Sequence, residues 1–133
     1  MRLKPSLESA DAALVLDAGL AQARAMGAPV CIAVVDEAGV LVTLRRLDGA
    51  KPHSVDLATR KARTAAALGL STAVLEQMAR EGRLPGGEVL ALGGGRPLTH
   101  GGETAGGVGV SGSTPDADDV IAGAAVGGLP AGA

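Results

Sequence analysis

The chain has no Phe, Tyr or Trp among its 133 residues. Aromatic side chains normally bury the largest apolar areas in a protein core. This core must therefore be built from Leu, Val, Ile and Ala, each of which buries less apolar surface. Small side chains let neighbouring elements approach closely, but they leave the core thin. We therefore expect contacts between subunits of a homo-oligomer to bury further surface.

The length indicates one domain that covers residues 1–133. The formal net charge of −2 creates no global field that would attract nucleic acid. The sequence has no apolar run long enough to span a membrane. Its single cysteine, Cys31, fits a reducing compartment. We expect a cytoplasmic protein that binds neither nucleic acid nor membrane.

Hydrophobic patterns and turn residues predict an α+β domain. "PVCIAVVDEAGVLVTLRRL" is typical of a hairpin whose first strand is apolar on both faces, and therefore central. We expect two further short strands near 89–92 and 97–100, and a fifth within "TAGGVGVSGS". Four helices are expected, near 7–26, 54–68, 71–81 and 115–126, with Ser6, Ser54, Ser71 and Thr114 as N-caps. The predicted sheet is antiparallel and five-stranded, with flanking helices.

The last predicted strand has one face that is almost bare backbone. Val108 and Val110 alternate there with Gly107, Gly109 and Ser111. A strand face without side chains permits close approach by a helix, a second subunit or a ligand.

Half of the basic residues lie in one short segment. Residues 45–65 contain six of the twelve, which are Arg45, Arg46, Lys51, Arg60, Lys61 and Arg63. The same segment contains His53, one of only two histidines. Such a concentration of positive charge in a slightly acidic chain suggests a site for a small anionic ligand.

Lys61 is the charged residue of this segment that faces an apolar region. On a helical wheel, Arg60 and Arg63 fall on a solvated side, whereas Lys61 lies between Ala65 and two leucines. Lys61 could line a pocket and receive an anion, or act as a base if desolvation lowers its pKa. The alternative is structural: the lysine extends along the edge of the apolar stripe, or pairs with Asp36 or Asp48.

The connection "RRLDGAKPHS" offers Arg46, Asp48, His53 and the free N–H groups of a helix start. Arginine side chains and helix N-termini both hold carboxylates or phosphates well. The same stretch also fits an ordinary polar loop, in which Asp48 and Gly49 make a turn.

The second histidine, His100, lies beside Glu103 in the turn "HGGE". The two histidines are far apart in sequence and have no neighbouring ligand cluster, so they do not define a metal site by themselves. His100 remains open as a metal or haem ligand, as a general base, or as a surface imidazole. The glycine clusters match neither a phosphate loop nor a dinucleotide fingerprint.

Four stretches together resemble the GlcG/HbpS-like family, often labelled haem-degrading domains and also found at the C-terminus of PduO-type proteins. They are "APVCIAVVDEAGVLVTLRRLDGA", "SVDLATRKARTAA", "LPGGEVLALGGGRPL" and "GGETAGGVGVSGSTPDADDVIA", in that order. The resemblance covers nearly the whole chain. It implies a five-stranded antiparallel sheet of profilin-like architecture and homo-oligomers from dimers to octamers.

The resemblance also implies candidate site residues and haem or another tetrapyrrole as a possible ligand. The positions that match the family are Asp36, Arg46, Asp48, Gly49, Ser54, Asp56, Lys61, Thr64, Ser111 and Gly112. Some haem-binding members use a histidine near the N-terminus, but the first histidine here is His53. No aromatic ring is available to stack on a porphyrin.

Two functions from different classes follow. In the first, a binding module holds haem or a small carboxylate near residues 45–64, with Arg46 and Lys61 on the carboxylates and Ser54 as a further donor. In the second, a cofactor-independent lyase, hydratase or isomerase acts on a small oxygenated acid. Lys61 or His53 would then be the base, and Asp36 or Asp48 would orient it. An accessory protein whose oligomer is its function is a third possibility.

Overall fold

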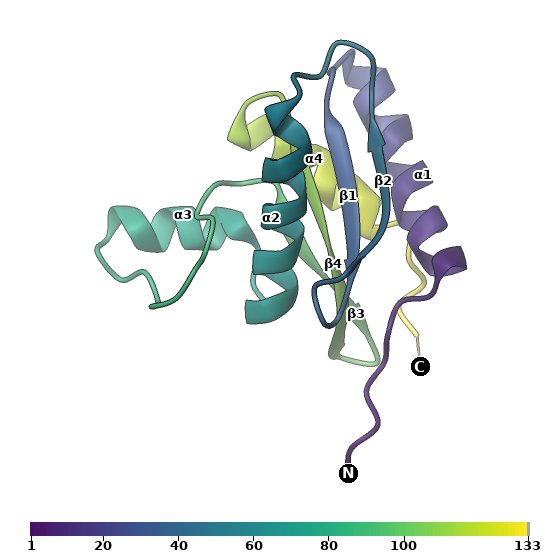
Figure 1. Ribbon diagram of the computed structural model, residues 1–133, viewed down its shortest axis with the longest axis vertical. Coiled ribbons are helices and arrows are strands. Elements are labelled where there is room, and N and C mark those ends of the chain that lie inside the picture. The colour runs from purple at the N-terminus through teal and green to yellow at the C-terminus, as the bar shows by residue number, and fades with distance from the viewer. Residues whose placement is uncertain (133) are drawn as a thin grey trace.

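The structure is a computed structural model that describes residues 1–132. Figure 1 shows an antiparallel sheet between two layers of helices. In chain order the elements are α1 (Ser9–Met26), β1 (Cys31–Asp36), β2 (Leu41–Arg46), α2 (His53–Leu68), α3 (Thr72–Arg80), β3 (Gly95–His100), β4 (Glu103–Ser111) and α4 (Pro115–Val126). Of the helices described, none is both long and apolar enough to cross a membrane.

The sheet has four strands in the order β2-β1-β4-β3, so the prediction of a fifth strand is wrong. Residues 89–92 form a loop after α3 instead. The backbone N–H of Leu90 donates to the hydroxyl oxygen of Thr64 on α2, at 3.2 Å, and not to a neighbouring strand. This short apolar stretch is therefore tied to a helix and adds no strand to the sheet.

The central position predicted for the first strand is confirmed. β1 pairs with β2 on one side and β4 on the other, and Cys31 to Val35 are fully buried. Its two faces contact different layers. Ile32 and Val34 join the main core with α1 and α4, whereas Cys31, Ala33 and Val35 face α2.

A helix, α2, packs on the nearly bare face of β4. The sequence had left a helix, a second subunit and a ligand as possible neighbours of this face. A Cβ atom on Gly107 would collide with the carbonyl oxygen of Ala62, and one on Gly109 with that of Ala58. On β3, a Cβ on Gly95 would lie 2.5 Å from the carbonyl oxygen of Lys61. The backbone of α2 therefore packs directly on the backbone of the sheet.

The helix ends follow local signals only in part. Gly27 and Gly69 end α1 and α2 in the left-handed conformation, as expected. Ser71 and Thr114 accept hydrogen bonds as N-caps of α3 and α4. The other two predicted caps, at Ser6 and Ser54, are wrong.

These two helix starts differ: α1 has another cap, whereas no side chain caps α2, whose N-cap residue is Pro52. α1 begins with a capping box between Glu8 and Asp11. Ser54 lies inside α2, where its buried hydroxyl donates to the carbonyl oxygen of Lys51.

We expect Gly109→Ala to lower the free energy of unfolding by about 3 kcal/mol, because its methyl group would overlap the backbone of α2. Gly86→Ala is the matched control, since a Cβ there meets nothing within 4 Å. Urea unfolding followed by far-UV circular dichroism measures both variants. Equal stabilities of the two would contradict this account of α2 packing.

Candidate functional site

Lys61 forms an ion pair that is enclosed by the fold. Its ammonium lies 3.2 Å from Oδ2 of Asp118 and donates to the carbonyl oxygen of Val110 at 2.9 Å. The two side chains are only 3% and 2% exposed. The close approach of α2 to the sheet carries Lys61 to the start of α4, so the pair joins the helical layers on opposite faces.

The surroundings of Asp118 stabilise this pair on its acidic side. Its Oδ1 accepts the backbone N–H of Ser113 at 3.0 Å. Burial raises the pKa of the Asp118 carboxyl above its ordinary value, while Lys61 and the Ser113 N–H oppose that rise. Gly94 covers the pair: a Cβ there would lie 3.0 Å from the Lys61 nitrogen.

The surroundings of Lys61 are therefore those of a residue that holds the fold together. Of the alternatives drawn from the wheel, an ion pair is what the fold contains, but its partner is Asp118 and not Asp36 or Asp48. Asp36 instead accepts the backbone N–H groups of Ala38 and Val40 with Oδ1, and so holds the β1–β2 turn. Asp48 lies exposed in the β2–α2 loop, where Gly49 adopts a positive φ of 90°.

Several predicted ligand-binding residues gather at one end of the sheet. Arg46, Cys31 and Ser111 occupy paired positions on β2, β1 and β4. Ser111 is buried, and Gly112 follows it with a φ of 129°. None of these residues lines either of the two hollows on the surface of the molecule.

The two histidines lie apart, each exposed. His53 is the first residue of α2, and His100 is the last residue of β3. Within residues 1–132, no three His, Cys, Asp or Glu side chains gather as a metal site requires. A metal-binding role for His100 thus has no companion ligands from the described part of this chain.

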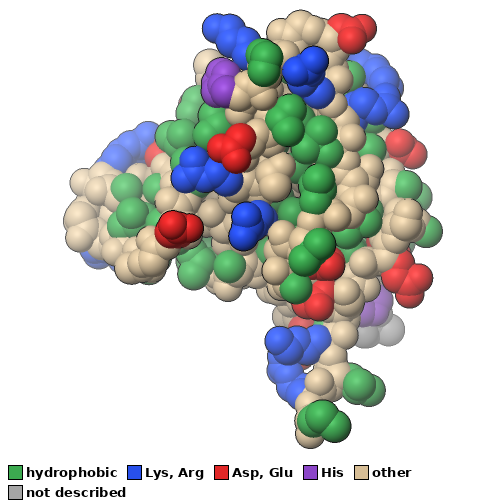
Figure 2. All heavy atoms as spheres, viewed as in Figure 1, with side chains coloured by type: hydrophobic (Ala, Val, Ile, Leu, Met, Phe, Trp, Pro, Cys, Tyr) green, Lys and Arg blue, Asp and Glu red, His purple; other side chains and the backbone are tan. Residues whose placement is uncertain are grey.

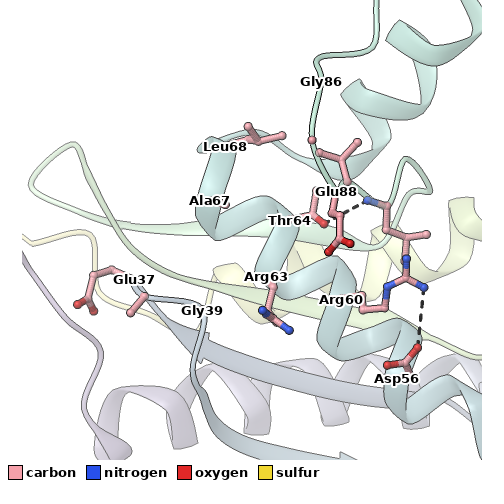
Figure 3. Close-up of a pocket in the computed structure, with 14 residues that line it drawn as sticks. Glu37, Gly39, Asp56, Arg60, Arg63, Thr64, Ala67, Leu68, Gly86 and Glu88 are labelled. Atoms are coloured by element: carbon pink, nitrogen blue, oxygen red, sulfur yellow. Dashed lines mark hydrogen bonds and ion pairs between the residues drawn. The ribbon is translucent and has the colours of Figure 1, made fainter.

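A hollow of about 440 Å³ lies on the outer side of α2. Its walls are α2, the β1–β2 turn and the loop after α3, as Figure 3 shows. Thr64, a predicted ligand-binding residue, lies in this wall. The hollow is lined by Glu37, Ala38, Gly39, Asp56, Arg60, Arg63, Thr64, Ala67, Leu68 and residues 86–90. Its volume is in the range typical of small-molecule sites, about 300–1,000 Å³.

Charged side chains of both signs face this hollow, and Figure 2 shows such charges interspersed over this side of the molecule. Arg60 lies 3.8 Å from Asp56, one helical turn away. Arg63 extends along Gly39 of the β1–β2 turn, where a Cβ would meet its Nε at 3.7 Å. Among residues 1–132, Arg63 and Glu88 form no ion pair or side-chain hydrogen bond. The wall of the hollow therefore contains one cation, Arg63, and two anions, Glu37 and Glu88, that have no side-chain partner among residues 1–132.

A second hollow, of about 430 Å³, lies beside the N-terminal segment. An ion pair between Arg2 and Glu103, 2.9 Å long, forms part of its wall. Glu37 lines both hollows, and its Oε2 is buried without a hydrogen-bond partner among the described residues.

Arg60 and Arg63 were predicted to lie on a solvated face and Glu88 was not considered, whereas the structure brings all three to the wall of one hollow. A signal was present in the helical spacing, since residues 56, 60, 63 and 67 lie on one side of α2. The facing wall comes from a glycine-flanked loop, and only the folded chain brings it there.

Together, the fold and the hollow define a class: a small α+β domain whose antiparallel sheet supports a helix with a ligand-sized hollow on its outer side. The family model "Haem degrading protein HbpS-like" matches residues 7–127. The chain belongs to this HbpS-like family.

Relatives and solved structures agree with this assignment. The Protein GlcG of Escherichia coli K12 is 35% identical over 114 residues, which cover 84% of this chain and 85% of that protein. A double mutant of HbpS from Streptomyces reticuli superposes with a TM-score of 0.87 at 32% identity, covering 98% of this chain and 91% of that one. A structure of the PduOC:Heme complex has a TM-score of 0.84 at 28% identity, covering 96% and 99%.

We expect Lys61→Met to destabilise the fold by about 3–5 kcal/mol, because it leaves the Asp118 carboxylate buried without its counter-charge. The double variant Lys61→Met, Asp118→Leu removes both charges and should recover most of that loss. Urea unfolding followed by circular dichroism measures all three proteins. A Lys61→Met variant as stable as the parent would show that the ion pair is dispensable.

We expect the Cys31 thiol to be unreactive in the folded protein. Burial raises its pKa to about 11, and the nearby Arg46 guanidinium only partly opposes that rise. At about pH 8 roughly one molecule in a thousand would carry the reactive thiolate. A disulfide reagent should therefore label Cys31 in denaturant but not in native buffer, and rapid native labelling would contradict this burial.

Proposed function

We propose that this protein binds a small molecule that bears a carboxylate, and holds it in the hollow along α2. The observation that carries the proposal is the Arg63 guanidinium, which faces a ligand-sized hollow and forms no ion pair among residues 1–132. Planar guanidinium groups bind carboxylates through paired hydrogen bonds. Thr64 accepts the Leu90 N–H and can still donate its own hydroxyl proton to a ligand oxygen.

Haem is the ligand that the family suggests, since one solved relative is a PduOC:Heme complex. One of its propionates would suit Arg63, whereas Arg60 lies 3.8 Å from Asp56. However, the described wall of the hollow contains no His, Cys, Met or Tyr that could ligate iron. His53 lies on the same side of α2 but outside that wall. The hollow thus suits a carboxylate contact and does not fit an axially ligated haem.

The enzymatic alternative has less support from the geometry. Lys61 would have to reach a substrate to act as a base, yet its ammonium is enclosed and donates to two acceptors. His53 is exposed and borders neither hollow. Binding is therefore the function that the arrangement favours.

Self-association also remains a prediction. Leu14 on α1 and Val120 on α4 are 47% and 54% exposed. Covering such side chains would add apolar burial to a core that lacks aromatic residues.

To test the carboxylate site, hexanoate is titrated into labelled protein and backbone amide shifts are recorded by NMR. We expect saturable shifts in residues 60–68 and 86–90. Arg63→Gln should weaken binding roughly tenfold, the loss expected for one charge-assisted hydrogen bond. Arg24→Gln, which removes an exposed arginine from α1, is the matched control and should change nothing.

Haemin provides a second test, and the chain's lack of aromatic residues makes any bound chromophore easy to detect. If haemin binds through its propionates, its Soret shift should disappear in Arg63→Gln and persist in His53→Ala. Saturable carboxylate binding that leaves the amides along α2 unchanged would contradict the proposed site.

A further inference from the structure

The charges around the hollow do not match a ligand that is only an anion. Its wall carries two basic side chains, Arg60 and Arg63, and three acidic ones, Glu37, Asp56 and Glu88. A wall built to hold a dianion would present mainly positive charge, because a like charge beside the ligand costs binding energy.

Two of these charges are already committed to each other. Arg60 and Asp56 lie 3.8 Å apart at i and i+4 on α2. Glu37 lies at the edge of the hollow, and Figure 3 shows its carboxylate pointing away from Arg63 and Glu88. The charges left for a ligand are therefore Arg63 and Glu88.

These two residues come from different walls. Arg63 projects from α2, whereas Glu88 belongs to the loop after α3, and Figure 3 shows both side chains at the hollow. Neither has an ion-pair partner among residues 1–132, including each other. Each side chain can therefore pair with a ligand group of opposite charge.

Apolar atoms make up much of the remaining wall. Ala67 and Leu68 of α2 and Val89 and Leu90 of the loop line the same hollow. Such side chains can cover a short hydrocarbon chain that joins two charged ends.

We propose that the ligand is a zwitterion: an acid that also carries an amino group, separated from the carboxylate by a short aliphatic chain. The carboxylate pairs with Arg63, and the ammonium pairs with Glu88. This inference rests on the proposed carboxylate site and adds the second charge. It makes Glu88 the residue that discriminates amino acids of this kind from simple fatty or dicarboxylic acids.

The test compares matched ligands by NMR titration at low ionic strength. The ligands are 4-aminobutyrate, 6-aminohexanoate and 8-aminooctanoate, each paired with the unsubstituted acid of equal length, and hexylamine as a cation alone. We expect at least one amino acid to bind roughly tenfold more tightly than its matched acid, as one further ion pair would give.

Variants assign that difference to a residue. Glu88→Gln should abolish the preference for the amino acid, and it should strengthen binding of the plain acid because a like charge is removed. Asp17→Asn removes the same charge from an exposed position on α1 and should leave the preference intact. Arg63→Gln should weaken both classes of acid.

The outcomes separate the two proposals. If every amino acid binds no more tightly than its matched acid, or if Glu88→Gln leaves the preference unchanged, the zwitterion inference is wrong. If Arg63→Gln still weakens binding of the acids in that case, the proposal of a carboxylate site is retained. If no acid shifts the amides of residues 60–68 or 86–90, both proposals fail together.

Discussion

The contact on which this fold depends is the packing of one helix backbone against a sheet without side chains between them. Gly95, Gly107 and Gly109 present bare backbone, and the carbonyl groups of α2 occupy the space that Cβ atoms would fill. A chain without aromatic residues cannot fill wide gaps between layers. Close approach compensates, because it brings many small atoms into van der Waals contact at once.

That approach also determines the environment of Lys61. With α2 lying so near the sheet, the lysine side chain reaches the end of β4 and meets Asp118 of α4, away from solvent. A buried pair of this kind adds little net stability compared with apolar residues of equal volume, but removing one partner is costly. Its effect is to fix α2 relative to α4, and α2 forms one wall of the hollow.

Local signals in the sequence predicted much of the fold. The hairpin, the glycine face of β4, and the caps at Ser71 and Thr114 depend on neighbouring residues, and each is as expected. The prediction of a strand at residues 89–92 was wrong, because a short apolar run does not reveal whether it joins a sheet or, as here, lies against a helix. The partner of Lys61 lies 57 residues away, and a helical wheel gives no information on contacts at that distance.

The candidate site was the least predictable part, because its walls meet only in the folded chain. The wheel correctly separated the inner and outer sides of α2, with Ala58, Ala62 and Ala65 buried and Arg60 and Arg63 exposed. What the wheel could not give is the segment that lies over the outer side. A loop from beyond α3 lies over the outer side and turns a solvated face into a wall.

The two sides of α2 therefore have different environments. Its inner side is committed to the sheet and to Asp118, where a single added methyl group or lost charge disturbs the packing. Its outer side carries Arg63 and Thr64, whose surroundings are a turn and a loop. Substitutions on the outer side can change the charge of the hollow without touching the buried contacts. The proposed binding is thus separable from stability by mutation within α2, so a loss of affinity in a folded Arg63 variant would report on the proposed ligand contact.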